Sequence, residues 1–374
     1  MRKLLFVVTE DWFFASHFLP MARVGLELGL DVVVVTRVRD HAEIIEATGA
    51  RVVALEAERR STNPLHALDT ARRLATILRR ERPDLVHCIS LKPILVGGLA
   101  ARLAGVKRTV FALTGLGFLG ARQDGTARLA RRIVRTIVRW GLETAGTHYL
   151  FENRDDPRLL GLDPASPQVT IVNGAGIDPA RYPASPLPEG DTLRLALVAR
   201  LLWSKGVDTA VEAVRLARSN GTNVELDLYG SPDPSNPKAV PLETLHDWSR
   251  EPGLRWYGPT RDIASVWREH DLAILPSRGG EGLPRTLLES AACGRAALTT
   301  DVPGCRDFVR DGEDGYVLPV GDAAGFAARI EELARDRARL SAMGESAAAR
   351  VRDGYTEEDV MATVAALYRR MGLG

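Results

Sequence analysis

Short apolar runs alternate with segments of helical periodicity along the first half of the chain. Runs of strand length occur at residues 4–8, 32–36, 52–55, 84–88 and 109–113. Because strands and helices alternate, the pattern predicts a parallel sheet that is covered by helices. Ligands bind beyond the carboxyl ends of the strands in such sheets. We therefore expect functional loops at residues 9–17, 89–93 and 114–120.

The same alternation returns in the second half of the chain. Strands are predicted at residues 193–199, 224–229, 254–257 and 272–276. Residues 181–191 carry three prolines and no periodicity, which is typical of a linker. A chain of 374 residues suits two domains of about 180 residues each. We expect an N-terminal domain at residues 1–184 and a C-terminal domain at residues 192–354.

Composition excludes several classes of function. The chain has 49 basic and 48 acidic residues, and a net charge of +1 gives no global attraction to nucleic acid. Three cysteines without metal-ligand spacing indicate a reducing cytoplasm and no metal site. No apolar run approaches the roughly 20 residues that span a bilayer. The run at residues 4–8 ends in Thr9-Glu10-Asp11, which favours a strand over a signal peptide.

Residues 272–294 describe a strand, a glycine turn and a helix. Pro284 suits a first helical position, and Gly294 is a typical helix end. The backbone N–H groups of Gly282, Leu283 and Arg285 would then surround a helix N-terminus, which favours an anion such as a diphosphate. Glu281 would lie in the loop beside that anion.

Glu289 falls inside this predicted helix among apolar residues. A carboxylate there needs water or a hydrogen-bond donor, and ribose hydroxyls would be suitable donors. The two acidic residues alone, however, favour a simpler interpretation, in which Glu281 is a loop charge and Glu289 a solvated helix residue.

Arg200 and Lys205 follow the strand at residues 193–199 and precede a helix, an order that describes a second phosphate site. On spacing alone, however, two basic loop residues are usually just solvated. Further strands end in Gly230-Ser231 and, after Tyr257, in Gly258-Pro259, where loops could hold a nucleobase by backbone contacts.

The stretch from Glu281 to Glu289 resembles the E-x7-E signature of the retaining glycosyltransferases of family four, and the resemblance continues to Asp307. It implies the α/β GT-B fold, in which two doubly wound, Rossmann-like domains face a central cleft. The last helix, at residues 355–374, would pack back on the first domain. Arg200 and Lys205 would bind the diphosphate of a nucleotide sugar, Glu281 the sugar hydroxyls and Glu289 the ribose.

The reaction implied by this resemblance is sugar transfer with retention from a nucleoside-diphosphate donor, for which we favour a UDP-sugar. No Asp-x-Asp motif lies beside the proposed phosphate site. Arg200, Lys205 and the helix N-terminus would neutralise the leaving diphosphate, so neither metal nor cofactor is expected. In a front-face mechanism that diphosphate accepts the proton of the acceptor hydroxyl.

Parts of the first half resemble family members that build cell-surface polysaccharides such as capsule and O-antigen, some on polyprenyl-diphosphate-linked acceptors. These parts are Thr9 to His17, Ser90 to Pro93 and Thr114 to Gly117. Many members place a histidine after the strand at residues 109–113, but this chain has Leu113-Thr114 there. The acceptor residues implied are Ser16, His17, His87, Lys92, Thr114 and Gly115.

Gly115, Gly117 and Gly120 form a literal G-x-G-x-x-G. The motif does not lie in the first strand–helix unit, and no acidic residue ends the next strand about 20 residues on. We interpret it as a turn that a substrate approaches closely rather than as a dinucleotide site.

Arg128, Arg132, Arg135 and Arg139 recur at spacings of four, three and four, so they share one helix face. This face is either solvated or lies against the anionic inner leaflet as a peripheral membrane contact. Two further function classes stay open: a nucleotide-sugar epimerase of the same fold, and a catalytically silent membrane-docking protein. The intact Glu281, Glu289, Arg200 and Lys205 argue against the silent protein.

Overall fold

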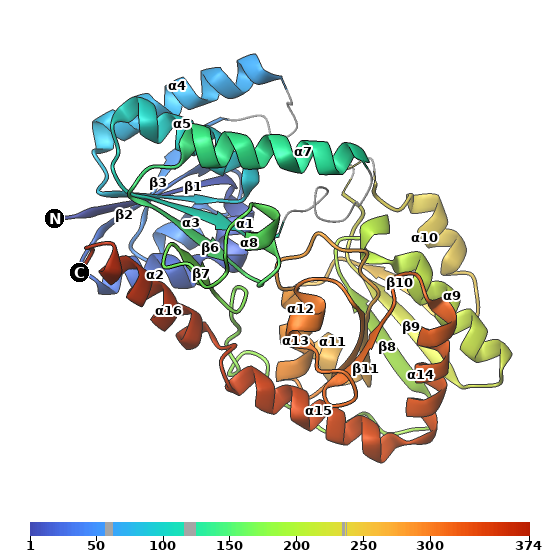
Figure 1. The fold of residues 1–374 in the computed structure, drawn as a ribbon. Coiled ribbons are helices and arrows are strands. Elements are labelled where there is room, and N and C mark those ends of the chain that lie inside the picture. Colours follow the sequence, from blue (N-terminus) through green and yellow to red (C-terminus); the bar gives the residue numbers. More distant parts are fainter. Residues whose placement is uncertain (57–62, 116–124, 234–235, 237) are drawn as a thin grey trace. The chain divides into compact units, whose positions relative to one another are not determined.

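The computed structural model describes residues 1–56, 63–115, 125–233, 236 and 238–374. The chain forms two compact units (Figure 1). Unit 1 contains residues 1–176 and 357–374, and unit 2 contains residues 177–356. The second unit thus begins at Ile177, before the boundary expected from the sequence.

Unit 1 is built on a parallel sheet with the strand order β3-β2-β1-β4-β5-β6-β7. The strands are β1 (Lys3–Glu10), β2 (Asp31–Arg37), β3 (Arg51–Ala54), β4 (Leu85–Ile89), β5 (Thr109–Leu113), β6 (Thr147–Phe151) and β7 (Val169–Ile171). Successive residues of β1 point to opposite faces, so Leu4 and Phe6 enter one core cluster while Leu5 and Val7 enter another. Both faces are covered, which explains why the central strands read as continuous apolar runs.

Helices of unit 1 divide between these two faces. One cluster packs against α1 (Asp11–His17), α2 (Leu19–Glu27) and α16 (Glu357–Arg370), and α16 lies along α2 (Figure 1). The other packs against α4 (Pro64–Glu81), α5 (Leu91–Ala104) and the π-helical turn η1 (Ile137–Leu142). Among the described residues of unit 1, the remaining helices are α3 (Ala42–Glu46), α7 (Gly125–Thr136) and α8 (Asp156–Leu159). The last helix of the chain therefore completes the first core.

Unit 2 repeats the plan with the order β10-β9-β8-β11-β12-β13. Its strands are β8 (Leu193–Val198), β9 (Val224–Tyr229), β10 (Leu254–Gly258), β11 (Leu272–Leu275), β12 (Ala296–Thr300) and β13 (Gly315–Leu318). Its helices are α9 (Val207–Ser219), α10 (Leu242–Trp248), α11 (Ile263–Glu269), α12 (Arg285–Ala292), α13 (Cys305–Phe308), α14 (Ala323–Arg335) and α15 (Arg337–Arg352), with a 3₁₀ turn η2 (Trp203–Lys205).

The segment predicted as a linker is part of unit 2, which corrects the sequence-based interpretation. Arg295 is fully buried. Its guanidinium donates to the carbonyl oxygens of Ser185, Pro186 and Trp267 and to the hydroxyl of Ser185. A buried cation needs such acceptors, and residues 185 and 186 of this segment provide three of them.

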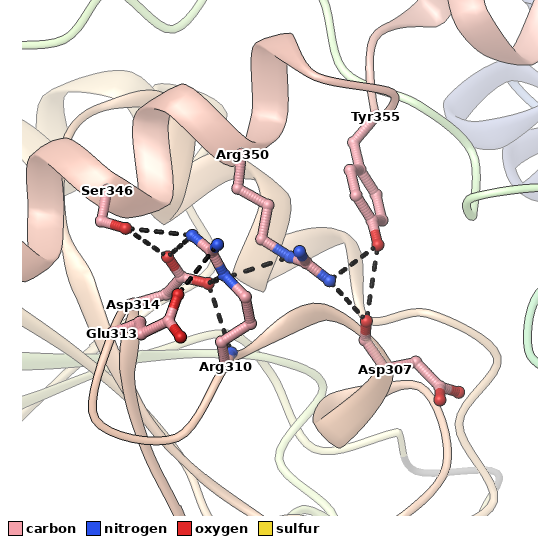
Figure 2. A network of polar contacts seen from close by, with 7 residues as sticks. All are labelled: Asp307, Arg310, Glu313, Asp314, Ser346, Arg350 and Tyr355. Atoms are coloured by element: carbon pink, nitrogen blue, oxygen red, sulfur yellow. Dashed lines mark hydrogen bonds and ion pairs between the residues drawn. The ribbon is translucent and has the colours of Figure 1, made fainter.

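A network of polar side chains joins α15 to the loop before β13 (Figure 2). Asp314 is buried and accepts hydrogen bonds from the side chains of Arg310, at 2.6 and 2.7 Å, and Ser346, at 2.8 Å. Burial alone would raise the pKa of Asp314, but these hydrogen bonds hold it below its ordinary value. Arg350 donates to the carbonyl oxygen of Asp307 and to the hydroxyl of Tyr355. The network therefore fixes α13 relative to α15.

Replacement of Asp314 tests this network. Asp314→Asn should lower the free energy of unfolding by about 1–3 kcal/mol at pH 7, because hydrogen bonds to a charged group are lost. Since the folded pKa is lowered, the contribution of Asp314 is present above the unfolded pKa and is lost as the pH falls through the folded value. The difference between wild type and variant in urea unfolding should therefore shrink below about pH 4.

Glu313 provides the matched control, because its carboxylate pairs with the same arginine at 2.9 Å but is largely exposed. Glu313→Gln should change the free energy of unfolding by at most about 0.5 kcal/mol. Equal effects of the two substitutions, or an Asp314→Asn effect that does not change with pH, would contradict the assignment.

Candidate functional site

Three loops of unit 2 meet at the carboxyl edge of its sheet. They follow β8, β11 and β12, which are neighbouring parallel strands. A Cβ atom on Gly206 would collide with the carbonyl oxygen of Pro276, and one on Gly304 would collide with that of Gly282. Both glycines also have positive φ angles, of 69° and 81°. Only glycine permits this backbone approach and this conformation together.

Lys205 and Glu281 form an ion pair where these loops meet. The Lys205 Nζ atom lies 2.5 Å from Glu281 Oε1, and the buried Ser277 hydroxyl donates to the same oxygen at 3.0 Å. Both charged side chains are more than four-fifths buried, so their interaction is strengthened by the weak screening of the site. The sequence predicted both residues but not their contact with each other.

Arg278 locks the turn that carries Lys205. Its guanidinium pairs with Asp208 at 2.6 Å and donates to the carbonyl oxygen of Trp203 at 3.0 Å. Its backbone N–H also donates to the carbonyl oxygen of Ser204. Sequence reasoning missed Arg278 because 70 residues separate it from Asp208. We interpret it as the residue that positions Lys205.

Helix α12 begins at Arg285, with Pro284 as the residue before its first turn, and ends before Gly294, which has a φ of 78°. The helix bounds therefore agree with the sequence-based expectation to within a residue. The turn that leads into α12 contains Glu281, Gly282 and Leu283, so the ion pair lies at the positive end of this helix dipole.

Glu289 is not solvated but buried in a cluster with two donors. Its Oε1 atom accepts hydrogen bonds from the Tyr182 hydroxyl at 3.1 Å and from Arg285 Nε at 2.9 Å. Burial raises the pKa of Glu289 in spite of the charge of Arg285. The four-residue spacing of Arg285 and Glu289 could have signalled this pair. Tyr182 could not be foreseen, because it lies in the segment interpreted as a linker.

The loops after β9 and β10 extend this edge. The backbone N–H of Gly230 donates to the carbonyl oxygen of Gly258 at 2.8 Å, and that of Leu201 donates to the carbonyl oxygen of Ser231 at 3.0 Å. Tyr257 is half-exposed and stacks on Tyr229, with ring centroids 5.1 Å apart. The residues predicted to hold the nucleobase therefore lie on neighbouring loops.

Arg200 lies on the β9 side of this edge. Its half-exposed guanidinium is 3.8 Å from Asp233, an acidic residue that sequence reasoning missed. Lys205 lies on the β11 side, where it contacts Glu281. The two predicted phosphate-binding cations thus each meet a carboxylate, and an anionic ligand would compete with both carboxylates.

The carboxyl edge of the sheet in unit 1 carries Ser90 and Thr114, whose hydroxyl oxygens are 3.2 Å apart. Ser90 has φ 77° and ψ 161°, a conformation that costs a residue with a side chain about 1–3 kcal/mol. Such strain is common at functional sites. Lys92 follows in the first turn of α5, and Gly115 has a φ of 96°. Gly117 and Gly120, which complete the glycine motif, lie outside the described residues.

Two histidines were predicted as acceptor contacts, and only one is accessible. His17 ends α1, a helix where the sequence suggested a loop, and its Nδ1 atom lies 2.6 Å from the hydroxyl of the exposed Ser16. His87 is fully buried within β4, and its Nδ1 atom lies 2.8 Å from the hydroxyl of Tyr368. Burial lowers the pKa of His87 to about 3. A contact between His87 and an acceptor is therefore contradicted by its burial.

The arginine face lies on α7 and continues into η1. Arg128, Arg132 and Arg135 are exposed, whereas Arg139 pairs with Glu143 at 3.1 Å. Among the described helices, none is long and apolar enough to cross a bilayer. Membrane binding by this face stays a prediction.

Two parallel, Rossmann-like α/β units of this kind make up the GT-B fold, the architecture of a large class of glycosyltransferases. A family model described as "Glycosyl transferases group 1" matches residues 192–336, and one described as "Glycosyl transferase 4-like" matches residues 3–150. Together the two matches cover most of the chain. The chain therefore belongs to glycosyltransferase family four, as the resemblance around Glu281 and Glu289 implied.

Individual relatives are bacterial polysaccharide glycosyltransferases. The chain is 25% identical to the N,N'-diacetylbacillosaminyl-diphospho-undecaprenol alpha-1,3-N-acetylgalactosaminyltransferase of Campylobacter jejuni, over 86% of each chain. It is 23% identical to the UDP-Gal:alpha-D-GlcNAc-diphosphoundecaprenol alpha-1,3-galactosyltransferase of Escherichia coli, over 75% of this chain and 74% of the relative. The fold resembles Anabaena HepE, solved with UDP and glucose, with a TM-score of 0.77, 15% identity and coverage of 99% and 100%.

The contact between Gly304 and Gly282 can be tested by substitution. Gly304→Ala should lower both stability and nucleoside-diphosphate affinity, because the new methyl group forces the loops after β11 and β12 apart. Titration calorimetry would measure the affinity, and thermal unfolding the stability.

Gly321 is the matched control, since its φ of 82° is the same but no atom lies within 4 Å of an added Cβ. Gly321→Ala should lower the free energy of unfolding by only about 1–2 kcal/mol, which is the cost of the left-handed conformation for a residue with a side chain. The affinity for the nucleoside diphosphate should not change. Identical behaviour of the two variants would show that the contact has no role in ligand binding.

Proposed function

We propose that this chain transfers a sugar, with retention, from a nucleoside-diphosphate sugar to a polyprenyl-diphosphate-linked glycan during cell-surface polysaccharide synthesis. We favour a UDP-sugar as the donor and the inner face of the cytoplasmic membrane as the place of reaction. The observation that carries this proposal is the Lys205–Glu281 pair at the start of α12. The two relatives named above act on diphospho-undecaprenol-linked substrates, and HepE was solved with UDP.

The donor diphosphate would bind at the N-terminus of α12 and beside Lys205 and Arg200. Negative charge grows on the leaving diphosphate as the bond between the anomeric carbon and the phosphate oxygen breaks. Fixed cations and a helix dipole stabilise that charge without reorganising. No metal is needed in this scheme, because these groups supply the positive charge.

Glu281 would change partners when the donor binds. Without a ligand, Lys205 balances the charge of Glu281 at 2.5 Å. An entering diphosphate competes for Lys205, and the carboxylate of Glu281 can then accept hydrogen bonds from the sugar hydroxyls. Its negative charge also lies near the positive charge that develops on the sugar ring, which lowers the barrier.

The proton of the acceptor hydroxyl would pass to the departing diphosphate. In the front-face reaction the new bond to the acceptor oxygen forms on the side that the diphosphate leaves, so configuration is retained. The bond between the anomeric carbon and the phosphate oxygen breaks, and the hydroxyl proton leaves on the released nucleoside diphosphate. We place the acceptor on unit 1, near Ser16, His17, Lys92, Thr114 and Gly115, where hydroxyl, imidazole and ammonium groups can bind sugar and diphosphate.

Product analysis tests the proposal directly. The enzyme should release UDP from a UDP-α-sugar only when a diphosphopolyprenol glycan is present, and NMR of the product should show an α-linkage. A β-linkage would contradict retention. Conversion of the donor sugar into its epimer without any acceptor would contradict transfer and support the epimerase alternative.

Lys205→Ala should reduce kcat by roughly 10²-fold or more, because it removes charge stabilisation that grows in the transition state. Lys107→Ala, at an exposed position of unit 1, is the control and should leave kcat unchanged. Steady-state UDP release measures both variants. A Lys205→Ala enzyme with wild-type turnover would place the diphosphate elsewhere.

Glu289→Gln should weaken nucleoside-diphosphate binding by about 1–3 kcal/mol in titration calorimetry, since hydrogen bonds to a charged acceptor are replaced by weaker ones. The amide keeps the shape of the buried side chain, so circular dichroism should show a folded protein. Tyr182→Phe separates the two roles of Glu289: it removes a donor to the carboxylate and should affect stability more than affinity. Unchanged affinity in Glu289→Gln would exclude its contact with the ribose.

A further inference from the structure

Helix α7 and its continuation η1 expose four large apolar side chains to solvent. The exposed fractions are 60% for Leu129, 51% for Ile133, 43% for Ile137 and 86% for Trp140. Their spacings of four, four and three residues place them in one line along the helix. We call these four residues the apolar stripe. The other exposed large apolar residues of the described chain lie on separate elements, and single residues of that kind are normal.

The apolar stripe is not needed to hold the helix on unit 1. Another side of the same helix does so: Val138 and Leu142 are buried, and Val134 packs against the same core cluster as α5. With about 100° of rotation per residue, Leu129 and Ile133 of α7 lie about a third of a turn away from Val134 on this packed side. Apolar side chains that stay in water do not stabilise a helix that is already held by its packed side. The apolar stripe therefore requires another explanation.

Charge indicates what covers the apolar stripe. Residues 125–142 contain five arginines and no acidic residue, although the whole chain has a net charge of only +1. Arg128, Arg132 and Arg135 are exposed and lie between the apolar stripe and the packed side. An apolar line beside a line of cations matches an anionic bilayer, whose acyl region and phosphates lie at different depths. Tryptophan is also enriched at this interface.

A second copy of the chain fits this surface poorly. A two-fold interface brings the same surface patch of both copies together, so the arginines of the two patches would be crowded against one another. No acidic side chain of the segment could compensate. The bilayer is therefore the occupant that this charge distribution favours.

We infer that α7 and η1 lie in the plane of an anionic membrane, with the apolar stripe inserted at the acyl boundary and the three exposed arginines at lipid phosphates. This inference rests on the proposed function, because it identifies the surface from which a polyprenyl-linked acceptor is reached. It differs from attachment by charge alone. Charge is screened by salt, whereas apolar insertion is not, so part of the binding should resist salt.

The test is flotation of the full chain with vesicles of phosphatidylcholine, with and without phosphatidylglycerol. Wild type should bind the anionic vesicles at least tenfold more tightly than the neutral ones at low salt, and should retain part of this binding at about 0.5 M salt, where screening is strong. Replacing Arg128, Arg132 and Arg135 by Gln should remove the preference for anionic lipid. Replacing Leu129, Ile133 and Trp140 by Gln should remove the salt-resistant part.

Trp140 gives a second readout. Brominated lipids should quench part of the tryptophan fluorescence of wild type, and Trp140→Phe should lose that quenching while it still binds vesicles. Leu242→Gln is the control for removal of an exposed apolar side chain, since Leu242 is similarly exposed on α10 of unit 2. It should behave as wild type in both assays.

Vesicle binding that is unchanged in the Leu129, Ile133 and Trp140 variant would overturn the inference. Loss of self-association in that variant, with vesicle binding intact, would overturn it in favour of a second copy. Nucleoside-diphosphate affinity, measured without lipid, should equal wild type in all these variants. A wild-type chain that binds vesicles as described but transfers no sugar would contradict the proposed function. The inference about the membrane-binding surface would not be affected by that result.

Discussion

The constraint on which the rest of unit 2 depends is the close approach of backbone segments at the carboxyl edge of its sheet. Gly206 contacts the carbonyl group of Pro276, and Gly304 contacts that of Gly282. Because glycine permits these approaches, the loops after β8, β11 and β12 lie close together, and Lys205 contacts Glu281 there. Arg278 and Ser277 then hold the pair in place from the β11 loop. The chemistry of the site is therefore a consequence of where the chain carries glycine.

Both acidic residues of the E-x7-E motif are already paired with cations. Glu281 contacts Lys205, and Glu289 contacts Arg285 and Tyr182. Carboxylates buried to this degree need such partners, and the pairing keeps the site charged and ordered before a ligand arrives. A donor that brings its own diphosphate and hydroxyl groups can exchange partners with these pairs instead of desolvating free charges. This exchange links the stability of unit 2 to the proposed binding of a nucleotide sugar.

Much of the fold could be predicted from the sequence, because buried parallel strands and amphipathic helices leave strong periodic signals. The strands around Leu4 and Leu272, and the bounds of α12, are examples. Contacts between distant segments could not be predicted: Tyr182 with Glu289, Arg295 with Ser185 and Arg278 with Asp208 are set by tertiary packing alone. His87 was misjudged because its strand is covered by α16, which comes from the other end of the chain. The arginine face was visible as a pattern, but the exposure of Trp140 was not.

Hydrogen exchange with and without UDP tests the central claim most directly. If the donor binds at the meeting point of these loops, UDP should protect the backbone amides of residues 199–206, 277–285 and 301–307, while the carboxyl edge of unit 1 stays unchanged. The Lys205→Ala variant should show weaker protection in the same segments. Protection confined to unit 1, or to loops of unit 2 outside these three segments, would contradict the account.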